Sequence, residues 1–158
     1  TMRRTFRRRR KEQKTDYRAR LALLKSQKPR LIIRKTNRAI IAQIIVSEGA
    51  QDKVLITVTS RDLLAQWWPK ESQGSLKSLP AAYLTGFLIA KKIKAKTPQA
   101  ILDLGLQRNI PRSRLYAVLK GAIDAGLSVP HSAEVLPTSE ILAKHKLNKL
   151  MEGLKHKL

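Results

Sequence analysis

The stretch that decides the fold runs from residue 28 to residue 46 and reads KPRLIIRKTNRAIIAQIIV. Two runs rich in β-branched residues, 31–33 and 39–46, flank the basic segment 34–38. β-Branched residues favour strands, and a short polar segment between two such runs is typical of a β-hairpin. The sequence therefore predicts two antiparallel strands joined by a basic turn.

A third strand is predicted directly after this hairpin, at residues 53–59. Val54, Ile56 and Val58 alternate with the other side chains and are expected on one face, because successive side chains of a strand point to opposite faces. Three consecutive strands would form a meander. Its first turn carries Arg34, Lys35 and Arg38, which solubility alone does not require, so we expect this turn to face an anion.

A short helix is expected before the meander. Asp16 or Thr15 is its predicted N-cap, and Tyr17, Leu21 and Leu24 recur at helical spacing as an apolar stripe. After the meander we expect a short helical turn at 61–67 and a surface loop at 71–78. The adjacent Trp67 and Trp68 could stack on bases, but packing in the core is the favoured interpretation.

The second half of the chain alternates helices with one strand. A helix is predicted from Ser78 to about Lys96, with Gly86 marking close packing on the sheet, and residues 99–104 are expected to form a strand covered on both faces. A clear amphipathic helix covers 115–123 and is expected to end at Gly126. A final helix is predicted from Ser139 to about Lys155, docking on this domain or on a neighbour.

The predicted fold class is α/β, a three-stranded antiparallel meander plus a further strand, packed by helices. The element order β-β-β-α-β-α is that of the ribonuclease-H-like layout. A basic N-terminal arm and a C-terminal helix are added to it. We divide the chain into a basic RNA-binding arm (1–14), an α/β domain (15–131) and a C-terminal helical extension (132–158).

The charge points to a polyanionic partner. Lys and Arg total 33 against 11 Asp and Glu, a net charge of +22 over 158 residues. A nucleic acid would relieve the self-repulsion that this excess creates. A membrane surface is disfavoured because the sequence offers no amphipathic anchor and no spanning segment, and the lack of cysteine fits a reducing, intracellular location.

The N-terminal arm holds the densest positive charge. Because it has little apolar surface to bury, we expect it to be disordered until it contacts nucleic acid. The alternatives are that the arm is a solvated tail or a nuclear-import signal. The candidate contact residues in the arm are Arg3, Arg4, Arg7, Arg8, Arg9, Arg10, Lys11 and Lys14.

The start of the helix at 115–123 is a candidate phosphate seat. Arg112, Ser113 and Arg114 stand there and Arg108 lies in the preceding loop. The helix dipole, free backbone N–H groups, a hydroxyl and guanidinium groups all favour an anion. An ordinary capped helix with surface arginines is the alternative.

No catalytic or metal site is expected, and no cofactor. A two-metal nuclease needs several converging carboxylates, whereas the acids here are scattered and Asp103 alone falls within a strand. A lone buried carboxylate is more often paired with an arginine. His131, His145 and His156 lack metal-ligand spacing.

Four blocks of sequence resemble a known family in the family's order: 6–21, 28–38, 80–86 and the pair 101–106 with 119–126. They resemble the L-eighteen family of large-subunit ribosomal proteins in its archaeal form, whose eukaryotic relative is called L-five. The resemblance implies a structural protein of the cytoplasmic ribosome that binds 5S rRNA in the central protuberance. Its implied further partners are large-subunit rRNA and neighbouring proteins, including the one called L-five in bacterial nomenclature.

The resemblance also implies which residues face RNA. Asn37 and Tyr17 are expected to read bases or ribose, and the arginines to position the RNA. The other residues carried over are Arg7 to Arg10, Arg18, Lys28, Arg30, Arg34, Lys35, Arg38, Arg108, Arg112, Ser113 and Arg114. Two rival hypotheses stay open: a DNA-compacting or generic nucleic-acid-binding protein, and a magnesium-dependent nuclease that uses Asp103.

Overall fold

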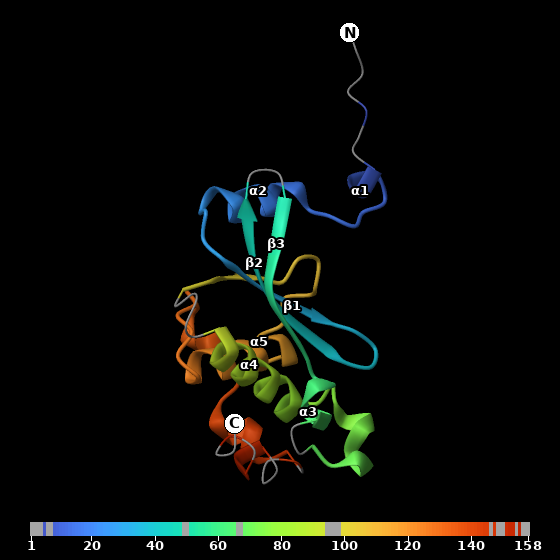
Figure 1. The fold of residues 1–158 in the computed structure, drawn as a ribbon, viewed down its shortest axis with the longest axis vertical. Helices are drawn as coiled ribbons and strands as arrows, with labels where there is room; N and C mark the ends of the chain where they lie inside the picture. Colours follow the sequence, from blue (N-terminus) through green and yellow to red (C-terminus); the bar gives the residue numbers. More distant parts are fainter. Residues whose placement is uncertain are drawn as a thin grey trace.

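A twisted four-stranded sheet covered by helices forms the body of the protein in the computed structural model (Figure 1). The structure describes residues 5, 8–48, 51–65, 68–93, 99–145, 147, 151–153 and 155. The fold is mixed α/β, as predicted. In chain order the elements are α1 (Arg8–Lys11), α2 (Tyr17–Lys25), β1 (Arg30–Lys35), β2 (Ile40–Glu48), β3 (Gln51–Thr59), α3 (Asp62–Ala65), the 3-10 helix η1 (Lys70–Ser75), α4 (Leu79–Ile93), β4 (Ile101–Asp103), α5 (Arg114–Asp124), the 3-10 helix η2 (Ala133–Val135) and α6 (Ser139–Ala143).

The sheet has the strand order β3-β2-β1-β4. Strands β1 and β2 are antiparallel, as are β2 and β3, which confirms the meander, and β4 runs parallel to β1. The strand expected at 99–104 is only three residues long and lies at the edge of the sheet, and its Ile101 and Leu102 are only partly buried, so the expected full cover on both faces is wrong.

A β-bulge interrupts the pairing of β2 with β3. The register shifts between Ile44 and Ile45, which face Ile56 and Val54. The bulge leaves Leu55 without an opposite residue and rotates the strand beyond it. Val54 is therefore turned away from the face of Ile56 and is 48% exposed, which corrects the predicted alternation.

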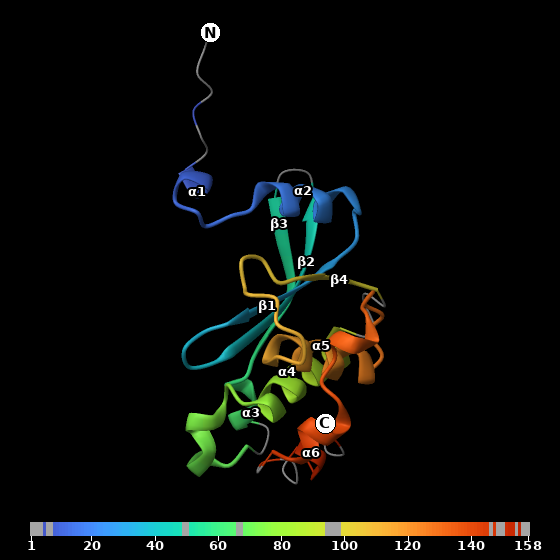
Figure 2. The same cartoon turned by 180° about the vertical axis from the view of Figure 1, so that it is seen from behind.

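Helix α4 lies between the sheet and other helical segments. It contacts β2 and β3, while α5 contacts α4 and β1 (Figures 1 and 2). A helix that is apolar all round has to be buried on all sides. Every residue from Pro80 to Ala90 is accordingly buried, and the core joins these residues to Leu31, Ile33 and Ile44 of the sheet.

Two glycines let α4 and α5 approach each other closely. A Cβ atom at Gly86 would lie 1.9 Å from the carbonyl oxygen of Val118, and one at Gly121 would lie 2.0 Å from that of Tyr83. The prediction that Gly86 marks a close approach is thus right, but its partner is α5 and not the sheet. The Tyr83 hydroxyl donates a hydrogen bond of 2.6 Å to Asp124 across the same interface.

The C-terminal segment packs on this domain. Leu142 and Met151 belong to the same core cluster as α4, and the Lys155 ammonium lies 5.7 Å from the centre of the Tyr83 ring. The single helix predicted from 139 to 155 is interrupted, because α6 ends at Ala143 and residues 144, 145 and 147 are not helical, whereas 151–153 and 155 are helical. The His145 ring then accepts a hydrogen bond from the Leu147 N–H, a local contact that competes with helix continuation.

The N-terminal helices lie at one end of the sheet, where α2 crosses the ends of β2 and β3 (Figure 1). Asp16 caps α2 through the N–H groups of Arg18 and Ala19, as predicted. All nine residues of α2 are described and none is buried; Leu21, expected in an apolar stripe, is 56% exposed. Residues 8–11 of the arm form α1 instead of the expected disordered segment.

The segment between β3 and α4 is more regular than expected. The loop predicted at 71–78 contains η1, and the short helix α3 ends at Ala65. Trp68 is buried, and its indole N–H donates to the carbonyl oxygen of Ser72, which confirms a core position. Trp67 and the helix end predicted near Lys96 lie outside the described residues.

Candidate nucleic-acid interface

The turn between β1 and β2 presents its basic residues to solvent. The Thr36 N–H donates to the Ala39 carbonyl oxygen, and the Thr36 hydroxyl bonds to both the N–H and the carbonyl of Ala39. These bonds close the turn and leave Lys35, Asn37 and Arg38 exposed. The turn therefore offers two cations and an amide on a rigid support.

Arg30 is buried and already paired, which removes it from the surface. Its side chain is 2% exposed and contacts Asp103 at 3.0 Å and Asp52 at 2.7 Å. Asp103 also accepts a bond of 3.1 Å from Arg34. This confirms the expectation that Asp103 pairs with an arginine. It corrects the role expected for Arg30, whose guanidinium has no open side for an RNA phosphate.

Asp52 links this buried pair to the N-terminal helix. Arg20 of α2 contacts the second carboxylate oxygen of Asp52 at 2.7 Å. Burial disfavours the charged carboxylate, but hydrogen bonds from Ser47, Arg20 and Arg30 outweigh burial and lower the pKa of Asp52 to about 2. The carboxylate therefore stays charged at any physiological pH.

The loop before α5 is held in place at three points. The Gly105 N–H donates to the Asp103 carboxylate, the Tyr116 hydroxyl donates to the Asn109 side chain, and the Arg112 N–H donates to the Val135 carbonyl oxygen. Arg112 has a φ of 58°, a left-handed conformation that is uncommon for a residue with a side chain. The loop is thus a defined shape with exposed cations.

Ser113 occupies the N-cap position of α5, as predicted. However, its side chain makes no capping hydrogen bond. Its hydroxyl oxygen is buried and has no partner among the described residues. The helix start therefore lacks the usual side-chain acceptor for its first N–H groups.

Three cavities are lined by part of the described cations. The first, of about 510 Å³, lies between the hairpin and the start of α5; the second, of about 640 Å³, between α2 and the loop after β4; the third, of about 360 Å³, beside the β1–β2 turn. Gln107 lines both the first and the second cavity. On the hairpin, Lys35 lines the first cavity and Arg38 lines the third. We call this surface the basic track. Its members are Arg9, Lys14, Arg20, Arg34, Lys35, Asn37, Arg38, Arg61, Lys77, Gln107, Arg108, Arg112, Ser113 and Arg114.

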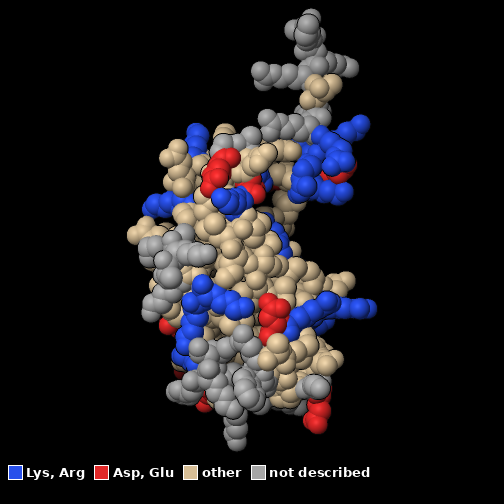
Figure 3. Space-filling model, in the orientation of Figure 1, with Lys and Arg blue, Asp and Glu red and all other residues tan. Residues whose placement is uncertain are grey.

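Cations lie both on the arm and on the body of the molecule. Figure 3 shows Lys and Arg side chains at the arm and on the body, with a hollow in the surface below α1. Of the predicted contact residues, Tyr17, Arg18 and Lys28 line none of the three cavities. Arg8, Arg10 and Lys11 lie in α1 and are also outside the cavities. Arg3, Arg4 and Arg7 lie outside the described residues.

The sequence analysis missed Arg20, Arg61, Lys77 and Gln107. Arg61 could have been found from topology, because β3 runs antiparallel to β2 and so ends beside the β1–β2 turn. Lys77 reaches the same cavity from the segment after η1, and no local pattern indicates that approach. Gln107 is a polar residue in a loop, a signal too common to single out.

The described residues form neither a metal-binding cluster nor a membrane-spanning helix. Within them, no group of three His, Asp or Glu side chains could hold a metal ion. Nor is any described helix both long and apolar enough to cross a membrane.

Comparison with known proteins decides the family. The family described as "Ribosomal large subunit proteins 60S L5, and 50S L18" matches residues 2–99 and 94–132. The chain belongs to this family. It is a structural constituent of the large ribosomal subunit and not an enzyme.

Three archaeal relatives, each named large ribosomal subunit protein uL18, match most of the chain. The Korarchaeum cryptofilum protein is 48% identical over 93% of this chain and 74% of its own length. Those of Methanoculleus marisnigri and Methanospirillum hungatei are 48% and 46% identical over 85% and 84% of this chain, and over 75% and 74% of their own lengths. Because the chain belongs to this family, the basic track is a surface of a ribosomal protein.

Proposed function

We propose that this protein binds 5S rRNA through the basic track and helps to attach it to large-subunit rRNA in the central protuberance of the cytoplasmic ribosome. The neighbouring protein called L-five in bacterial nomenclature is a proposed partner. The observation that carries the proposal is the convergence of the arm, the hairpin turn and the start of α5 on one surface. Family membership supplies the ribosomal context.

The proposed mechanism combines a rigid surface with an arm. The α/β domain (15–131) presents the hairpin turn and the α5 start, the arm (1–14) follows an RNA groove, and the C-terminal extension (132–158) supports the domain. Structured RNA is recognised mainly through phosphates, 2′-hydroxyls and shape. Lys35 and Arg38 would position phosphates, and Asn37 at the tip of the turn would read a base or ribose.

We also infer a ribonuclease-H-like layout for the domain. Three antiparallel strands followed by a helix, a strand parallel to β1 and a second helix support this inference. In the nuclease use of such a layout, acidic side chains hold metal ions. Here Asp103 instead neutralises Arg30 and Arg34.

A competition titration tests the proposed function. Labelled 5S rRNA is bound in the presence of excess transfer RNA or duplex DNA across a salt series. The variant is Lys35→Ala/Arg38→Ala, which spares Arg34 because that residue is paired with Asp103. The control is Lys91→Ala/Lys92→Ala, which removes the same charge from exposed positions near the C-terminal end of α4 that line none of the three cavities.

A preference for 5S rRNA that survives high salt and weakens only in the turn variant would support the proposal. Removing one phosphate-binding cation should lower the slope of log affinity against log salt by about 0.7 to 0.9. Equal competition by all three nucleic acids would favour the rival function, generic nucleic-acid binding, because charge alone would then drive association.

A further inference from the structure

The first cavity of the basic track is shaped for more than a phosphate. Its volume of about 510 Å³ falls in the range of small-molecule sites. Besides Lys35, Arg108 and Arg114, it is lined by the aliphatic side chains of Leu79, Ile110 and Leu115. A cleft that only followed an RNA backbone would need no apolar wall.

Ile110 is the unusual member of that wall. It is 47% exposed in a loop that also carries the cations Arg108 and Arg112. Large apolar side chains gain from losing contact with water, so an exposed one in a cationic cavity fits an apolar ligand surface. The face of a nucleobase is such a surface.

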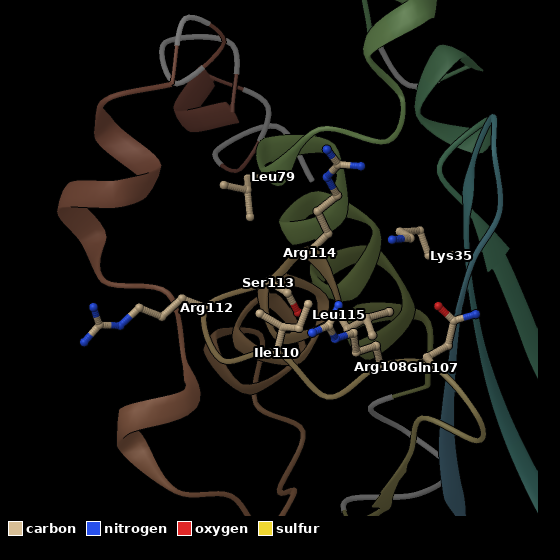
Figure 4. Close-up of a pocket in the computed structure, with 9 residues that line it drawn as sticks. All are labelled: Lys35, Leu79, Gln107, Arg108, Ile110, Arg112, Ser113, Arg114 and Leu115. Carbon is tan, nitrogen blue, oxygen red and sulfur yellow. The ribbon is translucent and has the colours of Figure 1, made fainter.

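Ser113 lines the same cavity at the start of α5. Its hydroxyl oxygen is buried and unpartnered within the described part of the chain, and it caps no N–H group of α5. Figure 4 shows Lys35, Arg108 and Arg114 around the cavity, whereas Arg112 points away from it. A phosphate at the start of α5 would meet the positive end of an eleven-residue helix, and Arg108 and Arg114 line the same cavity.

We propose that this cavity binds one unstacked nucleotide of the RNA, with its phosphate at the start of α5 and its base against Ile110. The inference rests on the proposed function, since it names what one part of the basic track binds. Gln107 at the edge would hydrogen-bond the ribose or the base edge, and the Arg114 guanidinium offers a plane on which a base can stack.

The test is an NMR titration of the isotope-labelled full chain with three probes: inorganic phosphate, ribose 5-phosphate and each of the four 5′-mononucleotides. All three should shift the backbone amides of Arg114 and Leu115. Only nucleotides should shift the Ile110 methyl signals, and they should bind roughly tenfold more tightly than ribose 5-phosphate, the gain expected from covering one aliphatic side chain.

Two variants and a control make the test specific. Ile110→Ala should remove the advantage of nucleotides over ribose 5-phosphate and leave phosphate affinity unchanged, whereas Arg114→Ala should weaken all three probes several-fold. Leu106→Ala is the matched control, because Leu106 is an exposed aliphatic residue of the same loop that does not line this cavity. Equal binding of nucleotide and ribose 5-phosphate, or an unchanged Ile110→Ala profile, would overturn the inference.

The NMR titration and the competition assay can fail independently of each other. Loss of nucleotide selectivity in this titration, with a retained 5S preference in the competition assay, refutes the nucleotide cavity alone. Nucleotide binding without any 5S preference refutes the proposed function alone. Shifts spread evenly over cations far from α5 would mean diffuse charge attraction and would also count against the cavity.

Discussion

Replacing Gly86 with alanine should destabilise the protein, although the same change stabilises most helices. In the interior of an exposed helix, alanine is favoured over glycine by about 1 kcal/mol. Here the added Cβ would lie 1.9 Å from the Val118 carbonyl oxygen and 2.7 Å from its carbon, both of them backbone atoms that no rotamer change can move. Relief therefore requires α4 and α5 to separate.

The size of the effect follows from these opposing terms. Ordinary overpacking of a core costs about 1 to 3 kcal/mol, and a clash with backbone belongs at or above the upper end of that range. After subtracting the propensity gain, we expect a net loss of about 2 kcal/mol in the free energy of unfolding. The backbone clash sets the sign of this change.

Urea unfolding followed by circular dichroism measures this loss. The matched control is Gly74→Ala in η1, where a Cβ would meet nothing within 4 Å, and its free energy of unfolding should be unchanged or slightly higher. A Gly86→Ala protein as stable as the wild type would refute the reasoning, because it would mean that the two helices are not in backbone contact.

Four further outcomes follow from the structure. Asp103→Asn should lower the free energy of unfolding by about 3 kcal/mol in urea unfolding, because it removes one of the two carboxylates that pair with the buried Arg30 and also the one that pairs with Arg34; an unchanged midpoint would contradict this. Because folding lowers the pKa of Asp52 from 3.8 to about 2, its charged carboxylate contributes fully to the free energy of unfolding above pH 4, and this contribution is lost as the pH falls from about 4 to 2. The free energy of unfolding measured over that range should fall by roughly 2 kcal/mol, and this fall should be absent in Asp52→Asn. Tyr116→Phe should cost about 1 kcal/mol, since it removes one hydrogen bond, and should weaken 5S rRNA binding several-fold in the competition assay, because Asn109 no longer anchors the loop; equal affinity would show that the loop is held by its other contacts. Asp103→Ala and wild type should both leave 5S rRNA intact with magnesium in a gel assay, and cleavage by wild type alone would revive the nuclease hypothesis.

The hairpin and the position of Asp103 were predictable because they depend on local patterns. Two β-branched runs separated by five polar residues leave little choice other than a hairpin. One acid within an apolar run has to find a cation, and β1 supplies Arg30 and Arg34. Gly126, with a φ of 101°, ends α5 for the equally local reason that glycine accepts this backbone conformation.

The errors concern partners that are distant in sequence. Arg30 and Arg34 look alike in the sequence and share a face of β1, yet Arg30 is buried and Arg34 is half-exposed. The difference comes from Asp52, which is 22 residues away and reaches Arg30 only because of the β2–β3 pairing. The partner of Gly86 depends in the same way on how helices meet in space, whereas the break after Ala143 has a local cause in the contact between His145 and Leu147.

Because α2 is weakly anchored, the arm and the domain are two binding parts of one chain. Its nine residues bury no side chain, and its ion pair with Asp52 is of a partly exposed kind that contributes at most about 1 kcal/mol. When two weakly binding parts share one chain, binding of the first raises the effective concentration of the second to the order of millimolar. Arm and domain would then hold a polyanion by avidity, so each could release and rebind its own stretch while the other prevents escape.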